Sequence, residues 1–137
     1  MATDHELDIL AKTLYGEARG EGREGLIAVA WVIKNRADNP GWWGKSIELV
    51  CLKPYQFSCW NADDPNAPYL RGRKLIPPRE YMRCREAAVA VLEGHEPDPT
   101  NGATHYYSTS MKKPPKWANS GTKTTQIGRH IFFKDVG

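Results

Sequence analysis

The feature that most constrains this chain is a glycine-rich junction, residues 15–22, between two helical patterns. Apolar residues recur at helical spacing on both sides of it: Leu7, Leu10, Ala11 and Leu14 before, and Leu26, Ile27, Ala30 and Ile33 after. Three glycines in seven positions (16, 20 and 22) are costly unless close approach or unusual backbone angles require them. We expect glycine in the left-handed conformation to end the first helix. Glu17 then lies at a helix end, held by rigid structure on both sides.

Periodicity predicts a mainly helical chain. We expect a helix over 4–18, capped by Thr3 or Asp4, and a second over 23–37 that is apolar around nearly its whole circumference and therefore central. Ser46 is expected to cap a short helix at 47–50, and a helix over 78–93 should end at Gly94. The segments 103–108 and 127–134 alternate as strands do. The proline-rich segment 53–79 predicts a long loop, either functional or packed by its own side chains.

Length and composition indicate one α+β domain over residues 1–137, with a small β element near the C-terminus. The 40% of hydrophobic residues suffice for one core, and no apolar run is long enough for stable membrane insertion. The N-terminus lacks the basic and apolar regions of a Sec signal peptide. Three cysteines without a CxxC pair fit synthesis in a reducing cytoplasm. We expect a monomer, and the net charge of +3 gives a mild bias towards anionic partners.

Two interpretations of Glu17 follow from the residues. With Arg19, Glu21, Arg23 and Glu24 it could form a solvated charged turn. Alternatively, it could be a carboxylic acid held beside a cleft, the setting of the general acid in enzymes that cleave sugar polymers. Burial raises the pKa of a glutamate, which keeps it protonated near neutral pH, and Tyr15 with the second helix behind it could supply that burial.

Several blocks of the chain resemble the SleB-type (spore-cortex-lytic) cell-wall hydrolases. The resemblance covers about residues 7 to 134, and blocks in the same order carry it: 15–21, 25–30, 33–36, 56–58, 103–107, 115–118 and 127–134. It implies a lysozyme-like fold that acts on peptidoglycan glycan strands, with the family's general acid at Glu17. Several members are lytic transglycosylases, which cleave between N-acetylmuramic acid and N-acetylglucosamine and leave a 1,6-anhydro end. A lone catalytic domain also resembles a phage or prophage endolysin, made in the host cytoplasm and released to the cell wall.

A second carboxylate distinguishes the two possible reactions. A hydrolytic muramidase needs one as nucleophile or base, and the candidates are Glu21, Glu24, Glu48, Asp63 and Asp64. None follows Glu17 in a compelling pattern, and Glu21 is better suited to bond backbone amides or Arg19, or to cap the second helix. A transglycosylase needs one carboxylate only, so the sequence favours that reaction and keeps the muramidase as the alternative.

Aromatic and amide side chains are the expected substrate contacts, because they stack on sugar faces and bond N-acetyl groups. The candidates are Gln56, Phe57, Ser58, Tyr106, Tyr107 and Trp117. Alternation should point one of the two tyrosines to the core and the other to the cleft. His105 and His130 could help to fix the cleft without acting as catalysts. Three further groups are expected outside the set of substrate contacts: Trp31, Phe132 and Phe133 in the core, Trp42 and Trp43 as a lid over the core or an exposed binding patch, and Lys112, Lys113 and Lys116 as solvated charges.

Three other functions compete with a glycosidase. A cysteine peptidase acting on wall peptides would use Cys59 with His105 or His130. A zinc amidase would need ligands from the histidines and cysteines, and neither HExxH nor a similar spacing occurs. A nucleic-acid binder would need a basic stripe, whereas the charges are balanced and evenly spread. We therefore expect an enzyme with no metal, no cofactor and no nucleic-acid partner.

Overall fold

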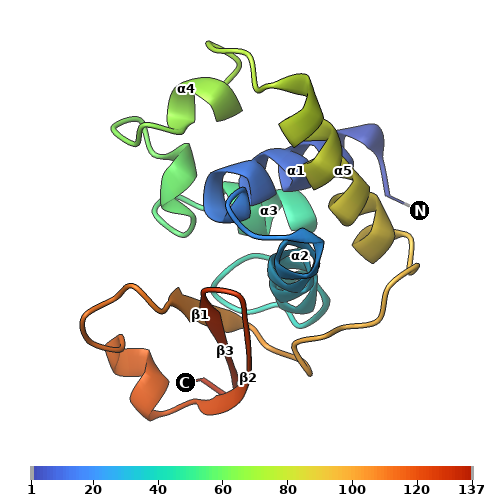
Figure 1. The fold of residues 1–137 in the computed structure, drawn as a ribbon. Coiled ribbons are helices and arrows are strands. Elements are labelled where there is room, and N and C mark those ends of the chain that lie inside the picture. Colours follow the sequence, from blue (N-terminus) through green and yellow to red (C-terminus); the bar gives the residue numbers. More distant parts are fainter. Residues whose placement is uncertain (1, 137) are drawn as a thin grey trace.

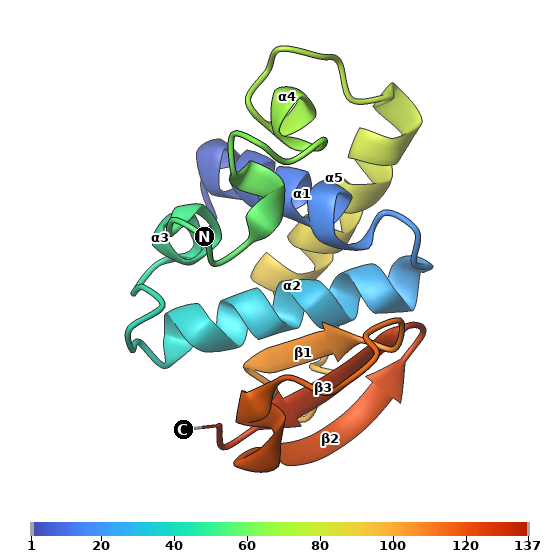
Figure 2. The same ribbon diagram turned by 90° about the vertical axis from the view of Figure 1, so that its left-hand side faces the viewer.

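The structure is a computed structural model that describes residues 2–136. Helix α2 (Arg23–Asp38) lies between a layer of helices and a small antiparallel sheet (Figures 1 and 2). The helical layer contains α1 (Asp4–Ala18), α3 (Ile47–Leu52), α4 (Ala67–Leu70) and α5 (Pro78–Leu92). The fold is α+β and mainly helical, as the sequence predicts.

Helix α2 is buried on both sides, which confirms its central position. Val29, Ala30 and Ile33 are fully buried in the large core shared with α1 and α5. On the opposite side, Ala28 and Val32 form a second apolar cluster with Phe132 of the sheet. Trp31 is half-buried against the large core, and its indole nitrogen donates to the Glu96 carbonyl over 3.2 Å.

The two ends of α1 have different explanations. At its start, Thr3 and Glu6 form a reciprocal capping box. At its end, the prediction of a left-handed glycine is wrong, because neither Gly20 nor Gly22 has a positive φ. Instead, the Glu21 amide donates a hydrogen bond of 2.9 Å to the Ala18 carbonyl and so closes the turn. Close approach, the other reason to expect glycine, holds at Gly16, where a Cβ would lie 2.5 Å from Cys59 Cβ. The glycine therefore lets the segment that carries Cys59 approach α1.

Three strands form the sheet, in the order β1 (His105–Ser108), β3 (His130–Lys134), β2 (Thr122–Ile127). The expected strands at 103–108 and 127–134 are shorter in the structure. Strand β2 was not predicted, because this half-exposed edge strand contains three threonines and a single apolar residue, Ile127. Residues 128 and 129 connect β2 to β3, with Gly128 at φ +56°. The register puts Tyr106 opposite Phe132 and Tyr107 opposite Ile131, so the two tyrosines face opposite sides.

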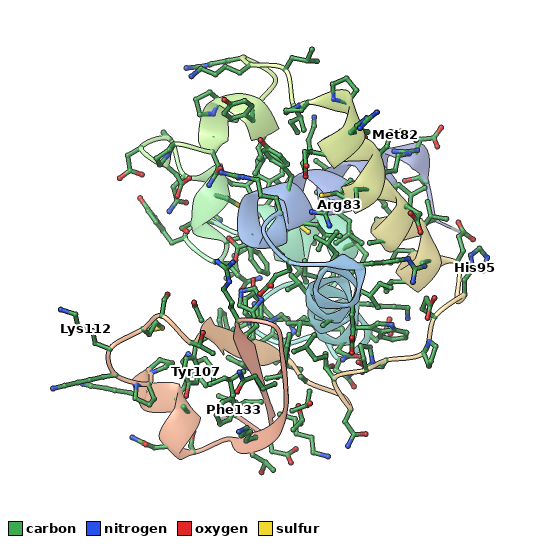
Figure 3. All side chains as sticks on the ribbon, in the orientation of Figure 1. Met82, Arg83, His95, Tyr107, Lys112 and Phe133 are labelled. Atoms are coloured by element: carbon green, nitrogen blue, oxygen red, sulfur yellow. The ribbon has the colours of Figure 1, made fainter. Side chains whose placement is uncertain are left out.

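The face of the sheet turned away from α2 is covered by the short helix η2 (Lys116–Asn119). Figure 3 shows Tyr107 and Phe133 between the sheet and this helix, and Trp117 packs against both rings at 5.9 and 5.4 Å. Phe132 is fully buried on the α2 side, and Phe133 is buried beneath η2. The two phenylalanines thus fill separate layers.

The proline-rich segment 53–79 contains two short helices, η1 (Ser58–Trp60) and α4, and packs on α1. The Trp60 indole nitrogen donates to Thr13 Oγ1 over 3.0 Å, and Leu70 is buried in the core. The prediction of a segment packed by its own side chains is therefore confirmed for the part that contains η1 and α4. Within residues 2–136, every helix is too short or too polar to cross a membrane.

Candidate active site

A cleft of about 480 Å³ lies where the end of α1, the last turn of α2, the loop at 53–57 and β1 meet. Its lining is Glu17, Arg36, Trp42, Lys53, Pro54, Tyr55, Gln56, Phe57, His105, Tyr106 and Trp117. A second hollow of about 680 Å³ shares Lys53, Pro54 and Tyr55 with it. The two hollows therefore adjoin at these three residues.

Glu17 lies in the last turn of α1, and its carboxyl group lines this cleft. Its Oε1 accepts a hydrogen bond of 2.6 Å from the hydroxyl of Tyr106. Burial raises the pKa of Glu17, and the charge of Asp64 adds to that rise, whereas the Tyr106 hydroxyl, the Cys59 thiol and Arg36 oppose it. Because the raising effects win, the carboxyl holds its proton at higher pH than an exposed glutamate does.

Tyr106 is fixed from behind by the sheet. Its ring contacts His130 at 4.8 Å and Phe132 at 5.8 Å between ring centres. Burial and the adjacent Glu17 raise the pKa of Tyr106 well above its usual range, so its hydroxyl stays protonated and donates. Strand alternation thereby aims a permanent donor at the Glu17 carboxyl.

Glu21 connects the glycine-rich junction to the β2–β3 turn. Its Oε1 accepts from the Arg129 amide over 2.8 Å, and a Cβ on Gly128 would lie 2.6 Å from Oε2. His130 Nδ1 is buried and lies 3.6 Å from the same Oε1, beyond hydrogen-bonding distance. Glu21 and His130 are therefore behind Tyr106 and are not part of the cleft lining. Glu21 bonds a backbone amide, as the sequence suggests, but the amide belongs to the distant β2–β3 turn.

Arg36, like Lys53, Pro54 and Tyr55, lines the cleft although the sequence analysis assigned it no role. It is 7% exposed, and its Nε donates to the Thr104 carbonyl over 2.7 Å. Its guanidinium lies over the rings of Trp43 and Phe57, at 5.5 and 5.6 Å. The available signal was an arginine in the last turn of α2, shortly after the continuous apolar stretch 26–33.

Aromatic side chains form the walls of the cleft. Trp42 is 65% exposed and Tyr55 is 85% exposed, and Tyr55 holds an uncommon φ of +64°. His105 packs between Trp43 and Trp117 in edge-on and tilted contacts. Burial, followed by the nearby charge of Arg36, lowers its pKa to about 4, so its ring is neutral at physiological pH. The Trp42–Trp43 pair thus divides: Trp43 packs against the core and Trp42 lines the cleft.

The other expected substrate contacts are only partly brought together. Phe57 is buried in the cleft wall, while the Gln56 amide donates to the Val50 carbonyl over 2.7 Å and fixes the loop. Ser58 is exposed at the start of η1, and Tyr107 lies under η2, so neither lines the cleft. Tyr106 and Trp117 do line it. The three lysines at 112, 113 and 116 are exposed, as expected.

Glu17 is the one carboxylate in the cleft lining of the described residues. Asp64 lies close enough for its charge to affect Glu17, but its Oδ1 accepts from the Asn66 amide over 2.8 Å in a local turn. Asp63 lines the adjoining hollow. Glu48 pairs with His5 at 2.9 Å, and Glu24 is exposed in the first turn of α2.

Neither alternative chemistry finds an assembled site. Burial raises the pKa of Cys59, and nearby Glu17 raises it further, which disfavours the thiolate that a peptidase requires. No hydrogen bond in residues 2–136 joins Cys59 to His105 or His130. The same residues contain no group of three His, Cys, Asp or Glu side chains placed to hold a metal ion.

Comparison with known protein families shows which family the chain belongs to. The family model described as Cell Wall Hydrolase matches residues 20–133. The chain belongs to this family. The match begins at Gly20, so Glu17 lies just before it, on the α1 side of the junction.

A second comparison finds spore cortex-lytic enzymes that are similar to this Cell Wall Hydrolase member. The spore cortex-lytic enzymes of Halalkalibacterium halodurans and Bacillus subtilis are 33% and 32% identical to it over 95% of the chain. The chain spans 35% and 38% of the lengths of these two relatives.

Solved structures extend the similarity to the fold. The catalytic domain of the Bacillus cereus SleB protein matches with a TM-score of 0.73 and 27% identity, covering 98% of this chain and 93% of that one. The catalytic domain of the germination-specific lytic transglycosylase SleB from Bacillus anthracis matches with the same score and identity, covering 97% of both chains. This Cell Wall Hydrolase member therefore has the lysozyme-like fold of the SleB catalytic domain.

Proposed function

We propose that this chain degrades peptidoglycan by cleaving the bond between N-acetylmuramic acid and N-acetylglucosamine, as a lytic transglycosylase that uses Glu17 as general acid and base. One observation carries the proposal: the cleft holds a half-buried carboxyl group with a raised pKa, bonded to the Tyr106 hydroxyl. Family membership and the similarity to a protein described as a lytic transglycosylase support it.

The reaction follows from one carboxyl group. Protonated Glu17 gives its proton to the glycosidic oxygen, and the bond to the anomeric carbon of muramic acid breaks. The carboxylate that remains is stabilised by the hydrogen bond from Tyr106 and by the positive charge of Arg36. It then accepts the proton of the C6 hydroxyl of the same sugar, whose oxygen attacks the anomeric carbon. The products are a 1,6-anhydro end and a free N-acetylglucosamine 4-hydroxyl, and Glu17 is again protonated.

The test combines one substitution with product analysis. Glu17→Gln keeps the size of the side chain but removes the acid, so we expect it to abolish clearing of cell-wall suspensions. Glu24→Gln, a change at an exposed carboxylate of the neighbouring helix, is the matched control and should retain activity. Mass spectrometry of wild-type fragments should show anhydro-muramic ends. Near-wild-type lysis by Glu17→Gln would refute the assignment of the catalytic residue.

A hydrolytic muramidase is the second candidate, because the charge of Asp64 reaches Glu17. In that reaction Asp64 would direct a water molecule or stabilise the positive sugar intermediate. The products would then carry reducing muramic acid ends, and Asp64→Asn would abolish activity together with Glu17→Gln. Anhydro ends with an active Asp64→Asn variant would dismiss this candidate.

We also propose that the biological setting is that of a phage or prophage endolysin, made in the host cytoplasm and acting on the wall after release. The proposal is an analogy with compact lytic enzymes. We expect expression of the chain alone in a bacterial cytoplasm to leave cells intact, and co-expression of a pore-forming membrane protein to cause lysis. Prompt lysis by the chain alone would point to a different release route.

A further inference from the structure

Arg36 is a buried cation that forms no ion pair with an acidic side chain of residues 2–136. It is 7% exposed, and no Asp or Glu oxygen of residues 2–136 lies within 4.0 Å of its nitrogens. A buried charge is costly unless it is paired and hydrogen-bonded. The only hydrogen bond that Arg36 makes within the described residues is from Nε to the Thr104 carbonyl. Its two terminal nitrogens thus have no acceptor from these residues.

The guanidinium is nevertheless held in a defined orientation. Trp43 and Phe57 pack against it, and the bond from Nε to Thr104 fixes the remaining direction. Because Arg36 also lines the cleft, the edge left unbonded is the side that a ligand can reach. A guanidinium edge offers two parallel N–H donors, which match the two oxygens of a carboxylate.

Glu17 does not fill this position. Its Oε1 is bonded to Tyr106, and no ion pair joins it to Arg36 in the part of the chain that the structure describes. In the proposed reaction Glu17 starts protonated and neutral, so the charge of Arg36 is then least compensated. A carboxylate on the substrate could approach Arg36 at this stage without repulsion from Glu17.

We propose that Arg36 binds a carboxylate on the muramic acid side of the substrate and so selects the sugar that lies next to Glu17. The inference rests on the proposed function. N-acetylglucosamine has no carboxylate, whereas muramic acid carries a lactyl group. That group offers a free carboxylate where the stem peptide has been removed, and otherwise the stem peptide offers its own. If the lactyl group is the ligand, a hydrolysis of the bond between muramic acid and peptide must supply the substrate.

The first experiment uses the wild-type chain and changes the substrate only. Glycan strands are prepared intact, or stripped of peptides by an amidase, and each preparation is also treated with carbodiimide and ammonia to convert carboxylates to amides. Loss of one charge-assisted pair should raise KM roughly tenfold to a hundredfold. If amidation raises KM for the stripped strands, the lactyl carboxylate is the ligand. If amidation raises KM for the intact strands but not for the stripped strands, the stem peptide supplies the carboxylate. Equal KM values for all four preparations would overturn the proposal.

The second experiment changes the protein. Arg36→Gln should raise KM on the carboxylate-bearing strands and leave KM on the amidated strands nearly unchanged. Arg79→Gln removes an exposed arginine of α5 and is the matched control. Binding of the same strands to Glu17→Gln, with and without Arg36→Gln, gives a readout that does not require catalysis. An equal loss of binding on charged and amidated strands would overturn the carboxylate-binding role of Arg36.

The two proposals fail in different ways. If the wild-type chain releases no fragments from any glycan preparation, the proposed function is wrong. If it cleaves all preparations with the same KM, only the role of Arg36 is wrong. Should Arg36→Gln not fold, which circular dichroism would reveal, the comparison of substrates with the wild-type chain still decides.

Discussion

Gly16→Ala tests how the cleft is assembled, because this glycine lies where η1 crosses α1. An alanine Cβ would lie 2.5 Å from Cys59 Cβ and 2.6 Å from its sulfur, closer than real Cβ atoms come to other atoms. A rotamer change of Cys59 would move its sulfur, but its Cβ is fixed to the backbone, so the 2.5 Å contact would remain. The segment that carries Cys59 would have to move away from α1, and Phe57 at the start of η1 would move with it.

Two effects of opposite sign determine how Gly16→Ala changes the free energy of unfolding. Alanine in a helix is about 1 kcal/mol more favourable than glycine. Overpacking of a rigid site costs about 1–3 kcal/mol, and a contact this short belongs at the upper end of that range. We therefore expect a net loss of about 1–2 kcal/mol in the free energy of unfolding, or about 4–8 °C in Tm for a domain of this size.

Urea unfolding and thermal melts measure this loss, and wall lysis reports the cleft. Gly20→Ala is the matched control: it lies in the same junction, nothing lies within 4 Å of its added Cβ and its φ is not positive, so its stability should change by less than about 0.5 kcal/mol. Adding Cys59→Gly should recover part of the loss, as a favourable coupling in a double-mutant cycle. Gly16→Ala as stable as the wild type, with equal activity, would refute the close-approach explanation.

Two further predictions concern the Glu17 carboxyl group. Tyr106→Phe removes a hydrogen bond that favours the carboxylate form of Glu17, so the alkaline limb of the pH–activity profile should move to higher pH. We also expect kcat to fall roughly tenfold to a hundredfold. An alkaline limb at an unchanged pH would contradict the assignment of Glu17 as the general acid. Because folding raises the pKa of Glu17 from its ordinary value of 4.5, this group's contribution to stability is complete below that pH and is lost as the pH rises through the folded pKa. The free energy of unfolding of Glu17→Gln minus that of the wild type should therefore be larger at pH 8 than at pH 4, as urea unfolding would show. A difference that is the same at both pH values would mean that Glu17 titrates in the folded protein as it does in the unfolded chain.

Local sequence patterns predicted the helices well. The 4–18 helix matches α1, and the 23–37 and 78–93 helices end within one residue of α2 and α5. Gly94, at φ +76°, ends α5 as expected. These elements depend on periodicity and capping, which act over a few neighbouring residues and can be read from the chain directly.

The missed elements depend on distant partners. Strand β2 has few apolar residues and is ordered by pairing with β3, although Gly128-Arg129 resembles a two-residue hairpin turn and could have predicted it. The short helices η1, α4 and η2 gave no periodic signal because each has only three or four residues. The left-handed glycine was wrong for a related reason: tertiary packing at Cys59, and not the turn geometry, explains a glycine in this junction.

The sequence by itself determined the helical framework, the family resemblance and the carboxylate most suited to acid catalysis, because each is written in contiguous residues. Only the tertiary structure decided which tyrosine faces Glu17, that Glu21 holds a distant turn, and that Arg36 is buried without an ion pair to an acidic side chain of residues 2–136. These three contacts join positions 68 to 108 residues apart, whose distance in space is fixed by how α2 packs between the core and the sheet. Burial and hydrogen bonding across that packing set the pKa of Glu17, and no local pattern encodes them.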